Sequence, residues 1–174
     1  HKTGTDRINE AIIKLGRTDV ELVMNLQGDE PLMNVADIQT LHAQMVKTKF
    51  ELGTLASNIT DHELYDNVNV VKVITKESLD NSQFPEAINF TRKLNDKPKN
   101  TYKHLGIYCY KLKTLEKFVS FNQSVNEIKY KLEQLRALDN EIKINVALAK
   151  SSPIGVDTKE DFVAIKKIME YKSK

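Results

Sequence analysis

The 174-residue sequence has a single cysteine and no long apolar run, and each scarcity excludes a class of protein. Cys109 alone cannot form a disulfide within the chain, which fits a reducing compartment. No apolar stretch approaches the roughly 18 residues that a membrane helix needs. We therefore expect a soluble, cytoplasmic protein with no membrane partner.

A strong charge of one sign is also missing. The chain has 26 basic and 24 acidic residues, with a net charge of +2. No Lys/Arg cluster forms the electrostatic footprint of a nucleic-acid binder. A nucleophile elbow, a phosphate-binding Gly-Lys-Thr loop and a Cys/His zinc cluster are all missing. We expect no nucleic-acid partner, and nothing around Cys109 suggests an activated thiol.

An apolar run that ends in glycine and acids stands out. Residues 20–24 are mostly apolar, and Asn25-Leu26-Gln27-Gly28-Asp29-Glu30-Pro31 follows. This pattern predicts a buried parallel strand over about 20–28 whose carboxyl end opens into a turn. Ligands of open α/β sheets bind at such ends, where an ionised Asp29 can hold Mg²⁺ against a phosphate. A turn with solvated acids also explains this stretch.

Helix-like and strand-like segments alternate along the chain. Periodicity predicts helices over 3–15, 34–47, 112–119, 124–138 and from 158 onwards, and strands over 52–59, 69–74, 87–90, 104–110 and 142–148. Residues 92–102 have no apolar period and predict a loop of the kind that covers a site. We expect one α/β domain over 1–174, with a mainly parallel sheet and helices on both faces.

Two acidic residues follow predicted strands far apart in the chain. Asp29 follows the strand over 20–28, and Asp157 follows the strand over 142–148. The carboxyl ends of parallel strands share one edge of a sheet, so the topology predicts that these carboxylates meet. Paired carboxylates are suitable ligands for Mg²⁺.

Other polar residues suit an anionic, hydroxyl-rich substrate. The helix start at Thr3, Gly4 and Thr5 offers free N–H groups for a phosphate or a base edge, and helix capping explains it equally. Glu133 and Gln134 can hydrogen-bond sugar hydroxyls, although such residues ordinarily form a solvated helix face.

Three further candidates lie in the second half of the chain. Arg92 can fork onto a carboxylate. His104 and Tyr108, four residues apart on a predicted strand, face the same side. An isolated arginine or histidine is more often a surface or core residue, so these assignments depend on the whole set.

Seven segments together resemble, in the same order, the 3-deoxy-manno-octulosonate (Kdo) cytidylyltransferase family. They are residues 1–7, 25–31, 70–73, 91–92, 104–108, 132–136 and 155–158. The resemblance implies a nucleotide-diphospho-sugar transferase (Rossmann-like) fold and a homodimer. It also implies that CTP and Kdo react to CMP-Kdo and diphosphate, for lipopolysaccharide synthesis.

The resemblance also implies roles for individual residues. Asp29 and Asp157 match the Mg²⁺ ligands and, with Arg92, form the catalytic set. The segment that lies against the cytidine matches Thr3, Gly4 and Thr5. The Kdo-binding residues match Gln27, Arg92, His104, Tyr108, Glu133 and Gln134.

Members of this family begin with a strand and a loop bearing Arg, Gly and Lys that grips the triphosphate of CTP. This sequence opens at His1, in the segment that follows that loop. We therefore expect the C-terminal two thirds of a longer cytidylyltransferase, inactive as a fragment. Two other interpretations stay open: a non-catalytic remnant that serves dimerisation or partner binding, and a cytidylyltransferase for another acidic or amino sugar.

Overall fold

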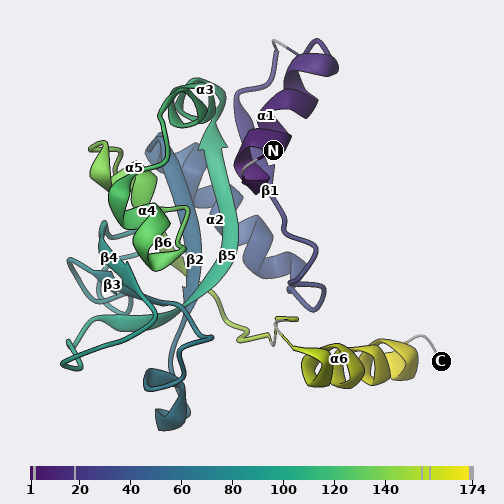
Figure 1. Ribbon diagram of the computed structural model, residues 1–174, viewed down its shortest axis with the longest axis vertical. Coiled ribbons are helices and arrows are strands. Elements are labelled where there is room, and N and C mark those ends of the chain that lie inside the picture. The colour runs from purple at the N-terminus through teal and green to yellow at the C-terminus, as the bar shows by residue number, and fades with distance from the viewer. Residues whose placement is uncertain (2, 18, 154, 157, 173–174) are drawn as a thin grey trace.

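The computed structural model describes residues 1–174 except 2, 18, 154, 157 and 173–174 (Figure 1). The helices are α1 (Gly4–Lys14), α2 (Val35–Thr48), α3 (Leu112–Ser120), α4 (Val125–Tyr130), α5 (Leu135–Asp139) and α6 (Lys159–Lys172), with a 3₁₀ turn η1 (His62–Tyr65). The strands are β1 (Leu22–Asn25), β2 (Leu52–Ser57), β3 (Lys72–Thr75), β4 (Ala87–Thr91), β5 (Thr101–Lys111) and β6 (Asn145–Leu148). The predicted α/β class is confirmed.

The strands form one mixed, six-stranded sheet in the order β4-β3-β5-β2-β6, with β1 also paired to β5. The long strand β5 runs antiparallel to β1, β2 and β3, and β4 runs antiparallel to β3. The β2–β6 pair is parallel. Strands β1, β2, β3 and β6 therefore point the same way, which agrees with the predicted sheet in strand direction. Strands β4 and β5 run against them, so among the described strands one pairing of five is parallel and the sheet is mixed rather than mainly parallel.

The strand predicted over 20–28 is shorter and differently paired than expected. It ends at Asn25, and among the described residues its strand partner is the antiparallel β5. The chain then turns, because the Glu30 N–H donates to Gln27 O (3.2 Å) and the Met33 N–H donates to Glu30 O (3.2 Å). These local bonds replace the ladder that a longer strand would form.

Helices cover both faces of the sheet, as predicted. On one face, Leu41 and Met45 of α2 pack against Leu55, Ile107 and other apolar residues of β2, β5 and β6. On the other face, α1, α3 and α5 cover the aromatic side chains of β5 (Figure 1). Burial of apolar area on both faces is the main favourable term in the stability of such a layered domain.

The single helix predicted over 124–138 is wrong. The chain leaves the helix at Lys131, which has a left-handed backbone (φ 54°), and a second short helix begins at Leu135. The break lets the buried Arg136 guanidinium fold back onto the Glu127 carboxylate, with N–O distances of 2.8 and 2.5 Å. A tertiary ion pair therefore overrides the helical periodicity.

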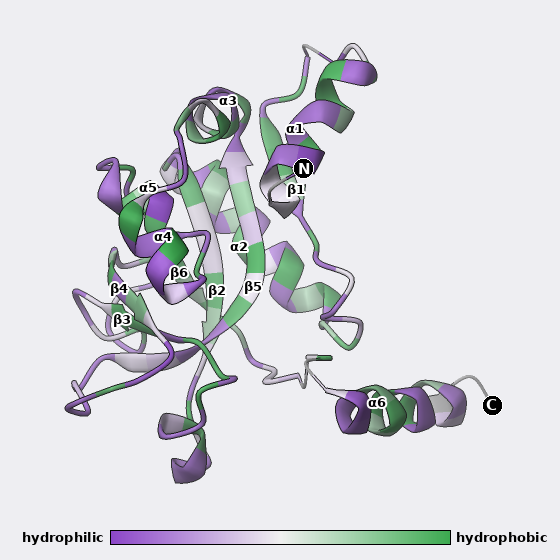
Figure 2. Cartoon of the chain, in the orientation of Figure 1, coloured by the Kyte–Doolittle hydropathy of each residue, from purple (hydrophilic) through white to green (hydrophobic). Residues whose placement is uncertain are grey.

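Helix α6 projects from the body of the molecule (Figure 1). Of the residues expected to face inward, Ile165 is buried, whereas Phe162, Ile168 and Met169 are exposed. Figure 2 shows green, apolar stretches alternating with purple, hydrophilic ones along this helix. Within the described ranges, neither α6 nor any other helix combines the length and the apolarity needed to cross a bilayer.

Candidate active site

A gap in the sheet creates the site. On one edge of β5, β1 pairs with residues 108–111 and β3 with residues 101–103, while β2 follows the opposite edge. Residues 104–107 are left between them, and a cavity of about 550 Å³ opens there. Seven of the predicted site residues line it: Gln27, Asp29, Arg92, His104, Tyr108, Glu133 and Gln134.

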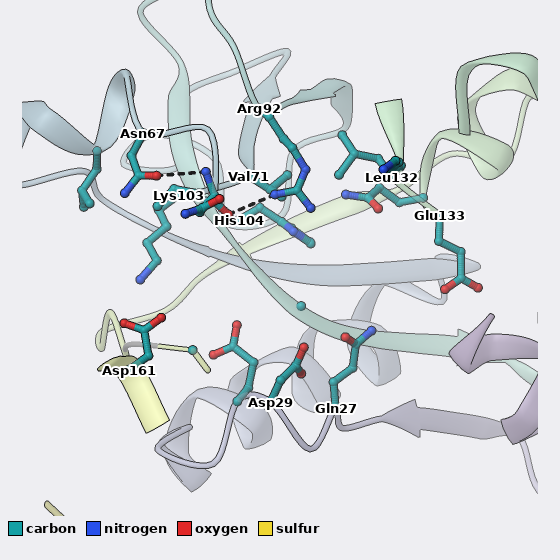
Figure 3. Close-up of a pocket in the computed structure, with 18 of the residues that line it drawn as sticks. Gln27, Asp29, Asn67, Val71, Arg92, Lys103, His104, Leu132, Glu133 and Asp161 are labelled. Carbon is teal, nitrogen blue, oxygen red and sulfur yellow. Dashed lines mark hydrogen bonds between the residues drawn. The ribbon is translucent and has the colours of Figure 1, made fainter. Parts of the chain in front are cut away.

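The floor of the cavity is kept open by a glycine in β5. A Cβ atom on Gly106 would lie 3.5 Å from Gln27 Oε1, so any larger side chain would enter the space between β5 and the turn after β1. Figure 3 shows Gln27 and Asp29 on one side of this space and Arg92 and His104 on the other.

The acidic side of the cavity comes from two strand ends. The Val156 N–H donates to Asp29 O (2.8 Å), which joins the segment after β6 to the turn after β1. The buried Asp37 carboxylate accepts the N–H groups of Lys150 (2.8 Å) and Ser151 (3.1 Å) and anchors the same segment. Strands β1 and β6 point the same way, so their carboxyl ends meet at one rim.

Asp157, the second predicted metal ligand, lies outside the described residues. Its neighbours Gly155 and Thr158 line the cavity together with Asp29. Thr158 starts α6 with the predicted capping box, since its N–H and hydroxyl both donate to Asp161 at 2.9 Å. The carboxylate of Asp161 also borders the cavity (Figure 3).

The opposite side is basic. Arg92 Nη1 donates to Val68 O (3.2 Å) and Asn69 O (3.0 Å), which fixes the guanidinium against the loop before β3. Lys103 Nζ donates to Pro153 O (2.6 Å) and ties β5 to the segment after β6. A guanidinium has five N–H donors, so Arg92 keeps donors for an anionic ligand.

His104 is a neutral hydrogen-bonding group. The Thr54 hydroxyl donates to Ile107 O (2.7 Å), so at its 2.9 Å contact with His104 Nε2 it can act only as acceptor. The proton therefore sits on Nε2, and Nδ1 is an acceptor. Burial lowers the pKa of His104 to about 3, and the imidazole stays uncharged.

Tyr108 completes the face that the alternation predicts. Its ring lies 5.5 Å from the His104 ring, centroid to centroid, so the two side chains do share one side of β5. Burial, first, and then the charges of neighbouring groups raise the pKa of the Tyr108 phenol well above its usual value. Tyr108 is therefore a neutral hydroxyl.

The buried His104 makes stability depend on pH. Its pKa is lower in the folded chain than in the unfolded chain, so the unfolded chain takes up more protons as the pH falls below about 6.5. Between pH 7 and pH 5 we expect His104 to remove about 2 kcal/mol of stability. Urea denaturation at both pH values should show this loss in the wild type and a smaller one in His104→Gln. Equal losses in the two proteins would contradict the assignment.

Thr3, Gly4 and Thr5 do not line this cavity. Thr3 caps α1 in the predicted capping box, with Asp6 Oδ2 accepting the Thr3 N–H at 3.1 Å. Thr5 is buried, and its side chain hydrogen-bonds Tyr110. Their contact with cytidine stays a prediction.

Three residues at or beside the cavity were not predicted from the sequence: the buried Lys72, and Asn67 and Asn69 of the loop before β3. A signal was available for Lys72, because it is the charged residue inside the β-branched run Val70–Ile74. A lysine in a strand with no polar face has to find buried partners.

Comparison with known proteins identifies the family. Residues 1–144 match the family model described as cytidylyltransferase. The chain belongs to this family. It is 37% identical over 173 residues to the 3-deoxy-manno-octulosonate cytidylyltransferase of Bartonella tribocorum and 39% identical over 176 residues to that of Francisella tularensis subsp. holarctica. Each match covers 97% of this chain and 70% of the relative.

Solved structures agree with this membership. The cytidylyltransferase chain superposes on CMP:2-keto-3-deoxy-manno-octonic acid synthetase complexed with CTP with a TM-score of 0.83 and 30% identity, covering 99% of this chain and 70% of the other. It superposes on apo UDP-glucose pyrophosphorylase with a TM-score of 0.68 at 15% identity, which shows a shared fold. The predicted nucleotidyltransferase fold and enzyme class are confirmed.

Proposed function

We propose that this cytidylyltransferase chain carries the metal-binding and sugar-binding parts of a site that converts CTP and Kdo to CMP-Kdo and diphosphate. The observation that supports this is the division of charge across the cavity. Asp29 and Asp161 line one side, and Arg92 lies on the other (Figure 3). An acidic sugar fits the basic side, and a cation between phosphates fits the acidic side.

The chain's own residues would bind and orient the sugar. The Arg92 guanidinium pairs with the carboxylate of Kdo as a two-point donor. His104 Nδ1 accepts a hydrogen bond from a sugar hydroxyl, and Glu133 and Gln134 bind others. Glu133 Oε1 is buried without a partner in the described structure, so it has an acceptor to offer. Rigid positioning of the attacking hydroxyl accounts for much of the rate in such transfers.

The residues present fit Mg²⁺ in the way that nucleotide enzymes usually hold it. The described residues contain no group of three or more His, Cys, Asp or Glu side chains that could cage a metal. Mg²⁺ is commonly held by one or two carboxylates, with water and substrate phosphates completing its shell. We infer that Asp29 and Asp157 hold the ion. When bound, it would neutralise charge on the phosphates as the two anions approach.

We further infer a cytoplasmic homodimer that serves lipopolysaccharide synthesis. An exposed apolar surface supports a second copy as partner, because Ile88 on the outer strand β4 and Tyr130 at the end of α4 are 61% and 48% exposed and border one cavity. Sedimentation velocity tests this inference, and a single species of monomer mass would contradict it.

The sugar assignment is tested by binding. Isothermal titration calorimetry should detect saturable binding of Kdo to the chain, weaker binding of N-acetylneuraminate, and a loss of about tenfold or more in Arg92→Ala. Equal binding of both acids would favour an enzyme for another acidic sugar. No binding of either acid would overturn the proposal.

The reaction is tested by diphosphate release from CTP with Mg²⁺ and Kdo. Two proteins are compared: this chain, and this chain joined to the part of the Bartonella relative that precedes the matched region. We expect release from the joined protein and little from the chain alone. Kdo binding without release from either protein would favour a non-catalytic role.

A further inference from the structure

Lys72 is a charged side chain enclosed by the protein beside the cavity. Its residue is 0% exposed, and Nζ donates to Asn67 O at 2.6 Å and to Arg92 O at 2.8 Å. Both acceptors are neutral carbonyl groups, and the salt bridges among the described residues do not include Lys72. Burial lowers the pKa of Lys72 even though the charge of Asp66 acts to raise it, and Asp66 forms its salt bridge with Lys97. A buried cation that makes its hydrogen bonds to neutral carbonyls is costly to keep, so a role beyond packing is indicated.

The bonds of Lys72 and Arg92 are reciprocal. Lys72 holds the backbone of Asn67 and of Arg92, while the Arg92 guanidinium holds the carbonyls of Val68 and Asn69. The two cations therefore fasten the same loop from both ends. Lys72 lies directly opposite Thr91 in the β3–β4 pair, so its ammonium reaches the point where Arg92 leaves the sheet.

The fastened loop is a wall of the candidate site. Residues 69–71 line the cavity together with Arg92, and Val71 O accepts the His104 N–H at 2.9 Å. A shift of residues 67–69 would consequently move the Arg92 guanidinium, which is bonded to the carbonyls of Val68 and Asn69. Figure 3 shows Asn67, Val71, Arg92 and His104 grouped at this wall.

We propose that Lys72 is a positioning residue, whose ammonium fastens the loop 67–69 to the Arg92 backbone and thereby orients the Arg92 guanidinium toward the carboxylate of an acidic sugar. The identity of the ligand rests on the proposed function, whereas the orientation of Arg92 by Lys72 is independent of it. Orientation before binding removes the cost of ordering a long side chain when the ligand arrives. Lys72 touches no substrate in this role.

The first experiment compares Lys72→Met with Lys93→Met. Methionine keeps the length of the side chain but leaves two buried carbonyls without a donor. The control removes the same charge from an exposed lysine next to Arg92. We expect calorimetry to show Kdo affinity about tenfold or more lower in Lys72→Met and unchanged in Lys93→Met.

The methyl ester of Kdo, which lacks the carboxylate charge, distinguishes a positioning role of Lys72 from a merely structural one. We expect the wild type to prefer Kdo over the ester and Lys72→Met to lose that preference. In the Arg92→Ala background, Lys72→Met should cause no further loss of Kdo affinity, because its effect acts through Arg92. Equal losses for Kdo and ester, or additive losses in the double variant, would overturn the proposal.

The second experiment needs no sugar. NMR of the arginine Nη–Hη groups should give slowly exchanging Arg92 Nη1 protons in the wild type, because Nη1 donates to Val68 O and Asn69 O, and rapidly exchanging ones in Lys72→Met. If Lys72→Met does not fold, Lys72→Gln is the second variant, because glutamine keeps an N–H donor. We expect the exchange rate of its Arg92 signal to lie between those of the wild type and Lys72→Met. An unchanged Arg92 signal in a folded variant would overturn the proposal, whereas failure of the wild type to bind Kdo would overturn only the proposed function.

Discussion

Asp29→Asn is expected to lower kcat/KM for diphosphate release by roughly 10³-fold in the joined protein described above. Asparagine has nearly the same shape as aspartate but no charge, so it cannot neutralise a divalent cation. Asp29 is exposed on the turn after β1, and its backbone oxygen, rather than its side chain, accepts the bond from Val156. The substitution should therefore leave the free energy of unfolding within about 0.5 kcal/mol of the wild type.

The control for this prediction is Asp80→Asn, which removes the same charge from an exposed position outside the cavity lining. Its kcat/KM should equal that of the wild type. Chelation of Mg²⁺ should abolish release from the wild type, and added Mg²⁺ should restore it. Normal turnover by Asp29→Asn at limiting Mg²⁺ would show that the metal assignment is wrong.

Arg136→Met is expected to destabilise the fold by about 3–5 kcal/mol. Arg136 is 1% exposed, stacks 4.6 Å above the Phe118 ring, and holds the Glu127 carboxylate in two hydrogen bonds. Its Nη1 also lies 3.7 Å from Asp6 of α1. Loss of the guanidinium leaves a buried carboxylate unpaired and releases contacts that join α1, α4 and α5.

The ion pair also has a pH signature. Burial acts to raise the pKa of Glu127, but the hydrogen bonds from Arg136 and other donors outweigh it and lower the pKa. A carboxylate with a lower pKa in the folded chain adds stability above its unfolded pKa, and that stability is lost as the pH falls toward the folded value. The penalty of Arg136→Met should accordingly shrink on acidification below about pH 4.

Urea denaturation at pH 7 measures this penalty. The double variant Glu127→Met/Arg136→Met is the informative control, because replacing both partners of a buried pair with apolar groups costs much less than removing one. We expect the double variant to recover a large part of the loss. A single variant within about 0.5 kcal/mol of the wild type would mean that the pair contributes little.

Local hydrogen bonding explains what could be predicted about the fold. The capping boxes at Thr3 and Thr158 each close within three residues, and both form as expected. Asn34 likewise caps α2 through the Ala36 N–H. The shared side of His104 and Tyr108 follows from strand alternation, which survives the register shift between β2 and β5.

Contacts between residues that are distant in the chain explain the features of the fold that could not be predicted from the sequence. Helix periodicity favoured one helix over 124–138, but a contact between Glu127 and Arg136 breaks it. The apolar stripe of α6 predicted an inward face, yet the segments that it contacts cover little more than Ile165. The sequence made no prediction about the burial of Lys72, which depends on carbonyls from two other segments.

The amino-acid order alone was enough for the caps and the alternation of elements, because each depends on neighbours within a few positions. The gap along β5, the opposed charges around the cavity and the fastening of Arg92 by Lys72 came from folding. They arise where strands that are distant in the sequence pair, and no short segment of the sequence determines the geometry of those pairs.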